Sequence, residues 1–448
     1  MQRSSCSLGH FTAISRKDSL HCVTIFLKLI LLMTHVGLDF GTANTSVAVN
    51  NDGQTSVLNL EGRSDSIPST LFFGFDDDYI EFGEAAFERY YFGDRGRFLR
   101  SFKSALGTST IDHTIRVKLN TYSIKDIIQQ YIGEVLARSE DKLGTPIKNL
   151  VVGRPVSFVD DNPQADKLAQ DALQDVVSNL GVENIEFQLE PIAAALNYGV
   201  TVRGEEMVLV IDIGAGTSDF SVVKFLSDGS AENLESQVIA NCGIHIGGND
   251  FDKQIALHRV MKFFGYQQHY KRRPELEVAN SYFFNASSWH QIDLLYDRKV
   301  INALNELKPQ VMNPETFTRF IELIESRQPH KVLGAVEKTK RQFASSDQAL
   351  IELPFVGDGL NIAMTGVDFQ SVSQSMCDDI IRTANQAIAN AGLVKADIDT
   401  VYVTGGSMGI THLHNMVLAE YPDSKVIDGD RSTAVARGLA LDAQRKFA

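Results

Sequence analysis

The chain is poor in cysteine, and its four cysteines are scattered, at Cys6, Cys22, Cys242 and Cys377. None of them belongs to a C-x-x-C pair, so the sequence gives no indication of a zinc site or of a disulfide framework. Cysteines in this arrangement are typical of free thiols in a reducing compartment. We therefore expect a cytoplasmic protein.

The sequence also lacks a dense block of lysine and arginine, and its formal net charge is -14 at pH 7. A protein that binds the phosphates of nucleic acid, or an anionic membrane surface, needs the opposite balance of charge. We therefore expect neither nucleic acid nor a membrane as a partner. A nucleotide is still an acceptable ligand, because backbone amides and a metal ion can carry its charge locally.

Long hydrophobic runs are absent as well. The apolar run over residues 22–33 is interrupted by Lys28 and is too short to cross a bilayer. Basic residues precede it, as in a signal peptide, but no small-x-small cleavage site follows. We expect the protein proper to start at Met33 and residues 1–32 to be an extension that is non-native or disordered.

The remaining composition is that of an ordinary globular protein, with 44% hydrophobic and 22% charged residues. A chain of 448 residues is too long for one hydrophobic core, so we expect two large lobes. From Val36 onward, β-rich runs alternate with amphipathic helices. The clearest predictions are a helix over 124–143, strands at 150–152 and 207–213, and several helices over 251–343.

Two stretches far apart in the chain share one signature. Residues 37–49 are GLDFGTANTSVAV, and residues 210–223 are VIDIGAGTSDFSVV. Each is a hydrophobic strand that ends in Asp-x-Gly, followed by a small polar turn and a second β-rich strand. A repeated supersecondary unit indicates two lobes of similar topology that face each other.

The repeated hairpins suit phosphate binding. Glycine permits positive φ and a close approach of the backbone to a ligand, and successive N–H groups in a tight turn form an anion site. Asp39 and Asp212 precede the two turns, where each can hold a water molecule of hydrated Mg²⁺. Two such turns on opposite lobes would clamp a triphosphate from both sides.

Three further stretches support a nucleotide site. A strand runs into a Gly-Gly turn over residues 401–407, where adenosine can lie on bare backbone. A second Gly-Gly turn precedes a helix over residues 242–252. Glu190 begins an alanine-rich helix that can cross closely against a neighbour.

The order of these motifs resembles that of the nucleotide-binding domain of the seventy-kilodalton heat-shock (DnaK-type) chaperones. The motifs, in chain order, are GLDFGTANTSVAV, GRPVSF, EPIAAALNYG, VIDIGAGTSDFSVV, IGGNDFD, EKTKRQFASS and VTGGS. The resemblance extends from about Gly37 to about Leu441, and it is greatest to the short YegD-like chaperones.

The resemblance implies an α/β, two-lobed actin/hexokinase/heat-shock ATPase fold. Each lobe would contain a duplicated, mixed five-stranded sheet flanked by helices, with an inserted subdomain. We expect lobe I over 33–203 with its insertion at about 67–143, and lobe II over 204–430 with its insertion at about 248–365. The last helix, within 431–448, would return to lobe I.

The resemblance also implies the ligands, ATP or ADP with Mg²⁺, and the roles of individual residues. Asp39, Asp212 and Asp219 would hold the hydrated metal ion. The residues that would take part in catalysis are Lys103, Glu190, Asp212 and Thr217. The residues that would contact the nucleotide are Gly41, Thr42, Ala43, Asn44, Gly214, Ala215, Gly216, Gly247, Gly248, Glu337, Lys340, Arg341, Gly405, Gly406 and Ser407.

Each of these signals has a simpler structural interpretation. Lys103 follows Arg97 and Arg100 on what the sequence predicts to be a short basic helix, where a lysine is usually a solvated charge. The trio Glu337, Lys340 and Arg341 has the spacing of an exposed ion-paired helix face. A pair of histidines, at 412 and 414, suggests a metal site, but at this spacing on a helix the two side chains point apart.

The chain departs from the family at four positions. Ala215 replaces a glycine of the second phosphate turn, and Gly409 stands where the family has an arginine that packs against adenine. Asn249 replaces an acidic residue, and Ser432 stands where the family has an aspartate near the ribose. These changes put the affinity for nucleotide and the rate of hydrolysis in question.

We expect ATP binding and slow, Mg²⁺-dependent hydrolysis between the lobes, in a nucleotide-gated switch without a peptide-binding domain. An exchange factor or another protein partner is compatible with this function, but the sequence does not identify one. Two alternatives belong to the same superfamily: a small-molecule kinase of the sugar type, and an actin-like filament or scaffold protein.

Overall fold

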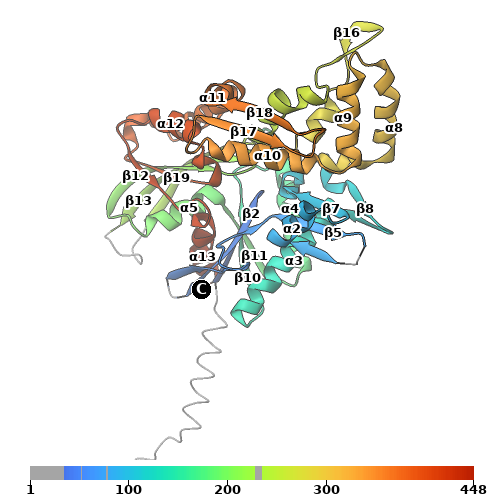
Figure 1. Ribbon diagram of the computed structural model, residues 1–448. Helices are drawn as coiled ribbons and strands as arrows, with labels where there is room; N and C mark the ends of the chain where they lie inside the picture. The colour runs from blue at the N-terminus through green and yellow to red at the C-terminus, as the bar shows by residue number, and fades with distance from the viewer. Residues whose placement is uncertain (1–34, 52, 77–78, 228–234, 448) are drawn as a thin grey trace, which may run out of the picture.

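The computed structural model describes residues 35–51, 53–76, 79–227 and 235–447. The extension expected over residues 1–32 lies outside the described residues. The two largest sheets of the described residues lie apart from one another, with helices between and around them (Figure 1).

The first sheet is built from the N-terminal part of the chain. Its strand order is β11-β10-β1-β2-β3, and the short β4 also pairs with β2. The strands β1 and β2 are antiparallel, whereas β1, β10 and β11 are mutually parallel. The bounds are β1 (His35–Phe40), β2 (Asn44–Asn51), β3 (Gln54–Val57), β4 (Ile67–Pro68), β10 (Asn149–Arg154) and β11 (Asn184–Leu189).

The second sheet repeats this topology. Its order is β14-β13-β12-β19-β20, with β12 antiparallel to β13 and parallel to β19. Thus β12 corresponds to β1, and the β12–β13 hairpin corresponds to the β1–β2 hairpin. The bounds are β12 (Gly204–Ile213), β13 (Ser218–Ser227), β14 (Glu235–Ile244), β19 (Thr400–Thr404) and β20 (Lys425–Asp428). The mixed α/β architecture and the repeated five-stranded path confirm the predicted two-lobed fold.

Two helices, α5 (Glu190–Gly199) and α13 (Ala434–Phe447), lie between the sheets (Figure 1). The last helix packs against β1, β2 and β10 of the first sheet and against α5. A Cβ atom at Gly438 would lie 1.7 Å from the backbone oxygen of Ala193, so the two helices cross at a distance that only glycine allows. The C-terminal helix therefore lies on the first sheet, while the lobe boundaries at 203/204 and 430/431 stay a prediction.

Helix α3 (Ile124–Leu143) has the bounds that its apolar periodicity predicts. It begins at a capping box, in which Ser123 Oγ accepts from the Asp126 N–H and the Asp126 carboxylate accepts from the Ser123 N–H. It ends at Gly144, which has a φ of 68°. Its buried face packs on the first sheet. The same helix contacts the chain segment that carries Lys103 and so holds that segment in place.

A small subdomain is inserted between β4 and α3. It consists of a three-stranded sheet in the order β6-β5-β7, the helix α2 and the hairpin β8–β9. The bounds are β5 (Thr70–Gly74), β6 (Ile80–Phe82), α2 (Glu84–Phe92), β7 (Gly96–Arg100), β8 (Thr114–Val117) and β9 (Asn120–Ser123). Helix α4 (Pro163–Asn179) packs beside α3.

A larger, mostly helical subdomain is inserted between β14 and β19. The helices expected over 251–343 are present, but a hairpin, β15–β16, interrupts them after Gly265, whose φ of 98° ends the preceding helical turn. The bounds are α6 (Gly248–Ile255), β15 (His269–Tyr270), β16 (Arg273–Glu277), α7 (Ser281–Ala286), α8 (Arg298–Leu307), α9 (Pro314–Glu325), α10 (Pro329–Gln342), β17 (Gln348–Leu353), β18 (Leu360–Thr365) and α11 (Gly366–Asn390). Helix α12 (Thr411–Ala419) follows β19 and lies outside this insertion.

Separate hydrophobic clusters support the two sheets, as expected for a chain too long for one core. One packs α3 and α4 onto the first sheet, and the other packs the second sheet against the helical subdomain. Among the described residues, no helix combines the length and apolar character needed to cross a membrane.

Candidate nucleotide site

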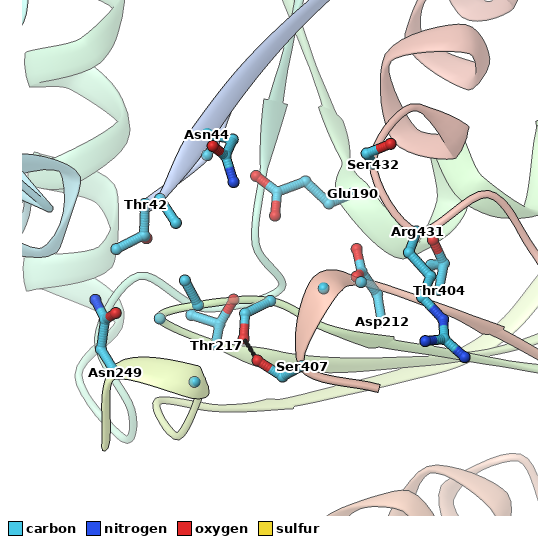
Figure 2. A pocket seen from close by; sticks show the side chains of 18 of the residues that line it. Thr42, Asn44, Glu190, Asp212, Thr217, Asn249, Thr404, Ser407, Arg431 and Ser432 are labelled. Carbon is cyan, nitrogen blue, oxygen red and sulfur yellow. Dashed lines mark hydrogen bonds between the residues drawn. The ribbon is translucent and has the colours of Figure 1, made fainter. Parts of the chain in front are cut away.

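A cavity of about 490 Å³ lies between the two sheets and is lined by residues from both. Its volume falls in the range of pockets that bind small molecules and cofactors. Figure 2 shows its polar side chains: Glu190 and Asp212 lie in the middle of the view, while Thr42 and Arg431 stand at opposite sides of it.

Two equivalent turns face each other across this cavity. The ladder of the first hairpin ends at the Phe40–Thr45 pair, and that of the second at the Ile213–Ser218 pair, so each leaves a four-residue turn. A Cβ atom at Gly216 would lie 2.7 Å from Thr42 Oγ1. The tips of the two turns are therefore in close contact, and their backbone N–H groups border one space.

Four carboxylates gather beneath these turns. Asp39 and Asp212 come from the ends of β1 and β12, Asp219 comes from β13, and Glu190 begins α5. Burial, reinforced by the charge of Glu190, raises the pKa of Asp39 and of Asp219 to about 7. The same causes, in the same order, raise the pKa of Asp212 well above its usual value. The site thus holds more negative charge than its own residues compensate.

Lys103 is the cation that faces this cluster. Its Nζ donates to Glu190 Oε1 at 2.8 Å, and both side chains are largely buried. The prediction of one short basic helix that carries Arg97, Arg100 and Lys103 was wrong for the two arginines. Residues 96–100 form strand β7, and Lys103 lies in a 3-10 turn over Phe102–Ala105 that packs under α3. This packing turns the lysine inward, away from solvent.

The carboxylates suit a hydrated Mg²⁺ better than a metal ion bound directly. Among the described residues, no three His, Cys, Asp or Glu side chains are grouped closely enough to bind a metal ion themselves. Oxygen donors that stand back from the centre fit Mg²⁺, which keeps several of its water molecules in proteins. Burial and the charge of Glu190 raise the pKa of Asp39 and of Asp219, so their ionised forms are unfavourable and a nearby cation would favour them.

Two predicted site residues do not line the cavity, although all the others do. Asp219 is buried behind the wall, where its Oδ1 accepts from the Val156 N–H at 2.7 Å. Gly247 lies under the second turn, since a Cβ atom there would be 2.6 Å from the carbonyl carbon of Ala215. Both residues support the turns from behind. Gly247 is therefore not placed to contact the nucleotide directly.

The helix α10 contributes a charged side to the cavity, and all three of its charged residues have partners, since Arg341 Nη2 lies 2.7 Å from Glu337 Oε1. Lys340 Nζ contacts Asp252 Oδ1 at 2.7 Å and donates to the Gly248 carbonyl at 2.6 Å. Glu337 accepts two hydrogen bonds from Arg100. The Arg341 side chain is 70% exposed, so it is the member of the trio with the most freedom to meet a ligand.

The Gly-Gly turn after β19 lies against the second hairpin. Gly405 has a φ of 85°, and a Cβ atom there would be 2.5 Å from Asp212 Oδ1. Ser407 Oγ donates to the Gly214 carbonyl at 2.7 Å, the bond drawn in Figure 2. The positive φ and the close approach both require glycine at 405. The turn therefore lies directly beside Asp212, the candidate for binding the metal ion.

Arg431 is a site residue that sequence reasoning missed. It lines the cavity, and its Nη1 is 3.3 Å from where a Cβ atom of Gly409 would be. The guanidinium therefore lies over the glycine that stands in place of the family's adenine-packing arginine. Only a comparison in space reveals this, because the two positions are far apart in sequence. A carboxylate oxygen of Asp428 is 3.6 Å from the Arg431 Nη2.

The other departures have simple structural consequences. Asn249 lines the cavity and its amide donates to Ser101 Oγ at 3.1 Å, across to the first subdomain. Ser432 also lines it, and its backbone oxygen accepts from Ser46 Oγ. His414, on α12, lies 3.3 Å from Asp428 Oδ1 and is away from the cavity lining.

Comparison with known families gives a match. The model of the family described as "Hsp70 protein" matches residues 35–275 and 317–445, which together are well over half of the chain. Both sheets, both turns and every residue that lines the cavity fall within the matched residues.

Proposed function

The chain belongs to the Hsp70 family, and on this premise we propose that it binds ATP with Mg²⁺ in the cavity between the sheets and hydrolyses it slowly. The observation that carries the proposal is the meeting of two equivalent Asp-Gly turns over one group of undercompensated carboxylates. Such a site offers backbone N–H groups to phosphates and oxygen atoms to a hydrated cation.

The residues divide into four groups along the cavity, which serve the phosphates, the metal ion, hydrolysis and the base. The turns at 41–44 and 214–217 bind the phosphates, with Thr42 and Thr217 at their tips. Asp39 and Asp212 hold water molecules of the Mg²⁺ ion, and Asp219 adds negative charge from behind the wall. When bound, the metal ion would neutralise phosphate charge and orient the triphosphate.

Hydrolysis requires a water molecule placed in line with the bond to the terminal phosphate, and charge stabilisation rather than a covalent nucleophile. Glu190 and Lys103 form a buried pair at this end of the cavity. The glutamate accepts a hydrogen bond from the attacking water, and the ammonium group stabilises negative charge on the transferred phosphoryl group. Preorganisation of Lys103 by Glu190 keeps the cation in place before the nucleotide arrives.

The base binds at the other end, on the bare backbone of Gly405 and Gly406. Arg341 and Arg431 both line this part of the cavity. A planar guanidinium stacks well on an aromatic base, so we assign Arg431 the place left open by Gly409. Adenine is the base expected from the family.

Closure of the lobes on ATP and their opening on ADP would change a surface that a protein partner reads. Within the family, we place this chain with the short YegD-like chaperones, as a cytoplasmic ATPase whose nucleotide state acts as a switch. The partner and any exchange factor are not identified by the site.

Isothermal titration of Mg·ATP into the wild type and into Asp212→Asn tests the proposal. We expect binding by the wild type that is at least about tenfold weaker in the variant, because the substitution removes one charge from the metal side of the site. ADP release, followed with and without sugars, measures hydrolysis and detects a kinase. Absence of binding heat in the wild type at several temperatures would defeat the proposed function.

A further inference from the structure

The first of the two turns is held from behind by a single serine. Ser69 directly follows β4 and is 1% exposed. Its Oγ donates to the Gly41 carbonyl at 2.7 Å, and its N–H donates to the Ala43 carbonyl at 2.8 Å. Both acceptors belong to the turn and line the cavity, whereas Ser69 does not line it. One residue outside the cavity therefore holds two carbonyl groups of the turn.

A second hydroxyl fixes the direction of the serine's bond. Thr45 Oγ1 lies 3.0 Å from Ser69 Oγ, and both residues are buried. A hydroxyl has one hydrogen to donate. Because the hydrogen of Ser69 goes to the Gly41 carbonyl, Thr45 is the donor between the two hydroxyls. The resulting chain of hydrogen bonds polarises the Ser69 hydroxyl and strengthens its bond to the turn.

The segment that carries Ser69 is itself held in place. The strand β4 pairs with the start of β2. Tyr131, fully buried on α3, donates to the Pro68 carbonyl at 3.0 Å, next to the serine. The Tyr131 ring also meets the ring of Phe102 edge-on, with 5.2 Å between the ring centres. The support of Ser69 is therefore shared with the short turn that contains Lys103.

Holding these carbonyls sets the direction of two N–H groups of the turn. A peptide unit is planar and trans, so its C=O and N–H point in opposite directions. The Gly41 carbonyl shares its peptide unit with the Thr42 N–H, and the Ala43 carbonyl shares its unit with the Asn44 N–H. Ser69 draws both carbonyls away from the cavity. The two N–H groups therefore face the side on which Thr42 and Asn44 line it (Figure 2).

The turn cannot hold this direction by itself. A Cβ atom at Gly41 would lie 2.1 Å from the Asn44 carbonyl oxygen, so the position requires glycine. Glycine has the widest range of backbone conformations, and it loses the most freedom when it is fixed. The peptide unit that follows Gly41 therefore needs a bond from outside the turn to keep its orientation.

The second turn is held in an equivalent way, but by more than one residue. Ser407 Oγ donates to the Gly214 carbonyl at 2.7 Å, and Gly214 is the counterpart of Gly41 in the second hairpin. The same carbonyl also accepts from the Gly248 N–H at 3.0 Å. In the first turn, the bonds to both carbonyls come from Ser69 alone, so this turn is the more sensitive of the two to the loss of one hydroxyl.

We propose that Ser69 is a positioning residue of the phosphate site, whose hydroxyl aims the Thr42 N–H at the phosphates of the nucleotide without touching the nucleotide. The inference rests on the proposed function and deepens it. The binding of the phosphates depends on Ser69, whereas the binding of the nucleoside, on the backbone of Gly405 and Gly406, does not. A residue that only stabilised the fold would affect both parts of the ligand alike.

The variant Ser69→Ala removes the hydroxyl and leaves the N–H that bonds to Ala43. We expect its affinity for Mg·ADP, measured by calorimetry, to fall at least about tenfold, because hydrogen bonds to charged groups are strong. Adenosine has no phosphates, so its affinity, measured by NMR titration, should stay within about twofold of the wild-type value.

Ser139 on α3 provides a matched control. It is fully buried, and its Oγ donates to the Val135 carbonyl at 2.7 Å. Ser139→Ala therefore removes an equal hydroxyl that is bonded to a backbone carbonyl outside the turn. We expect its affinities for Mg·ADP and for adenosine to equal those of the wild type.

Hydrogen exchange of the nucleotide-free protein gives a readout that does not depend on the proposed function. The N–H of residue 69 is bonded to the Ala43 carbonyl, so its exchange reports directly on movement of the turn. After correction for the intrinsic rate of the new residue, we expect this exchange to be at least about tenfold faster in Ser69→Ala. It should be unchanged in Ser139→Ala.

The outcomes separate the two proposals. If Ser69→Ala keeps the wild-type affinity for Mg·ADP, or loses affinity for ADP and adenosine to the same extent, the positioning role is wrong. If the wild type binds no nucleotide, the proposed function fails, while hydrogen exchange still decides whether the serine holds the turn. Far-UV circular dichroism shows whether each variant is folded. Ser69→Cys, which fills a similar space with a weaker donor, replaces Ser69→Ala if that variant is not folded.

Discussion

Removal of the Asp219 carboxylate should stabilise the protein while weakening metal-dependent binding. Asp219 is 1% exposed and lies beside Asp212 and Glu190, so its ionised form is unfavourable in the folded state without a cation. In Asp219→Asn the side chain is neutral at every pH, and its oxygen can still accept from the Val156 N–H. The main change is therefore the loss of one buried negative charge.

The magnitude follows from the pKa. Burial raises the pKa of Asp219 from 3.8 to about 7. With a raised folded-state pKa, the group's contribution to stability is fully present below pH 3.8 and is lost as the pH rises to about 7. At about 1.4 kcal/mol per pKa unit, this loss amounts to about 2 kcal/mol at pH 5 and about 4 kcal/mol at pH 7.5. The asparagine variant avoids it.

Urea unfolding with EDTA present, at pH 5 and at pH 7.5, measures the difference. We expect Asp219→Asn to be more stable than the wild type at both values, with the larger gain at pH 7.5, provided that unfolding is two-state. Added Mg·ADP should narrow the gap, because it stabilises the wild type more. A variant less stable at pH 7.5, or a gain independent of pH, would refute the charge argument.

Three more predictions concern single contacts. Lys103→Ala should keep nucleotide binding, and its rate of single-turnover hydrolysis should fall at least about a hundredfold. Lys125 is more exposed, so Lys125→Ala should hydrolyse ATP at the wild-type rate. Equal rates in the two variants would remove the catalytic role of Lys103. Arg431→Ala should weaken ATP binding in calorimetry by about tenfold, and Gly409→Arg added to it should restore affinity, since the two positions share one space. Gly438→Ala should lower the free energy of unfolding by about 3 kcal/mol or more in urea titrations, because its Cβ would overlap the Ala193 carbonyl.

The sequence predicted those parts of the fold that repeat or have a clear period. Helix α3 was found with its bounds, because six apolar residues at helical spacing share one face. The two hairpins were found because the same strand-turn-strand signature occurs twice. In each case the information is local, so the residues that decide the structure stand next to each other.

The parts that were missed depend on contacts between distant residues. Residues 96–105 contain three basic side chains that suggest a helix, yet β7 forms because Gly96–Arg100 pairs with β5. Arg431 reaches the cavity only because α13 returns to the first sheet. The burial of Lys103 likewise follows from packing under α3, and its charge alone would have placed it in solvent.

The carboxylates of the cavity make a contribution to the closed form that is opposite to that of two ion pairs, Arg97–Asp293 and Arg100–Glu337. Asp39 comes from the first sheet and Asp212 from the second, so without a cation their charges repel across the cavity and favour separation of the sheets. The pairs of Arg97 and Arg100 join oppositely charged groups across the same boundary and favour contact. Binding of Mg²⁺ with nucleotide would remove the repulsion and leave these ion pairs unopposed. It follows that Asp293→Asn should open the nucleotide-free protein far more than the Mg·ADP-bound protein, because only the first still experiences the repulsion.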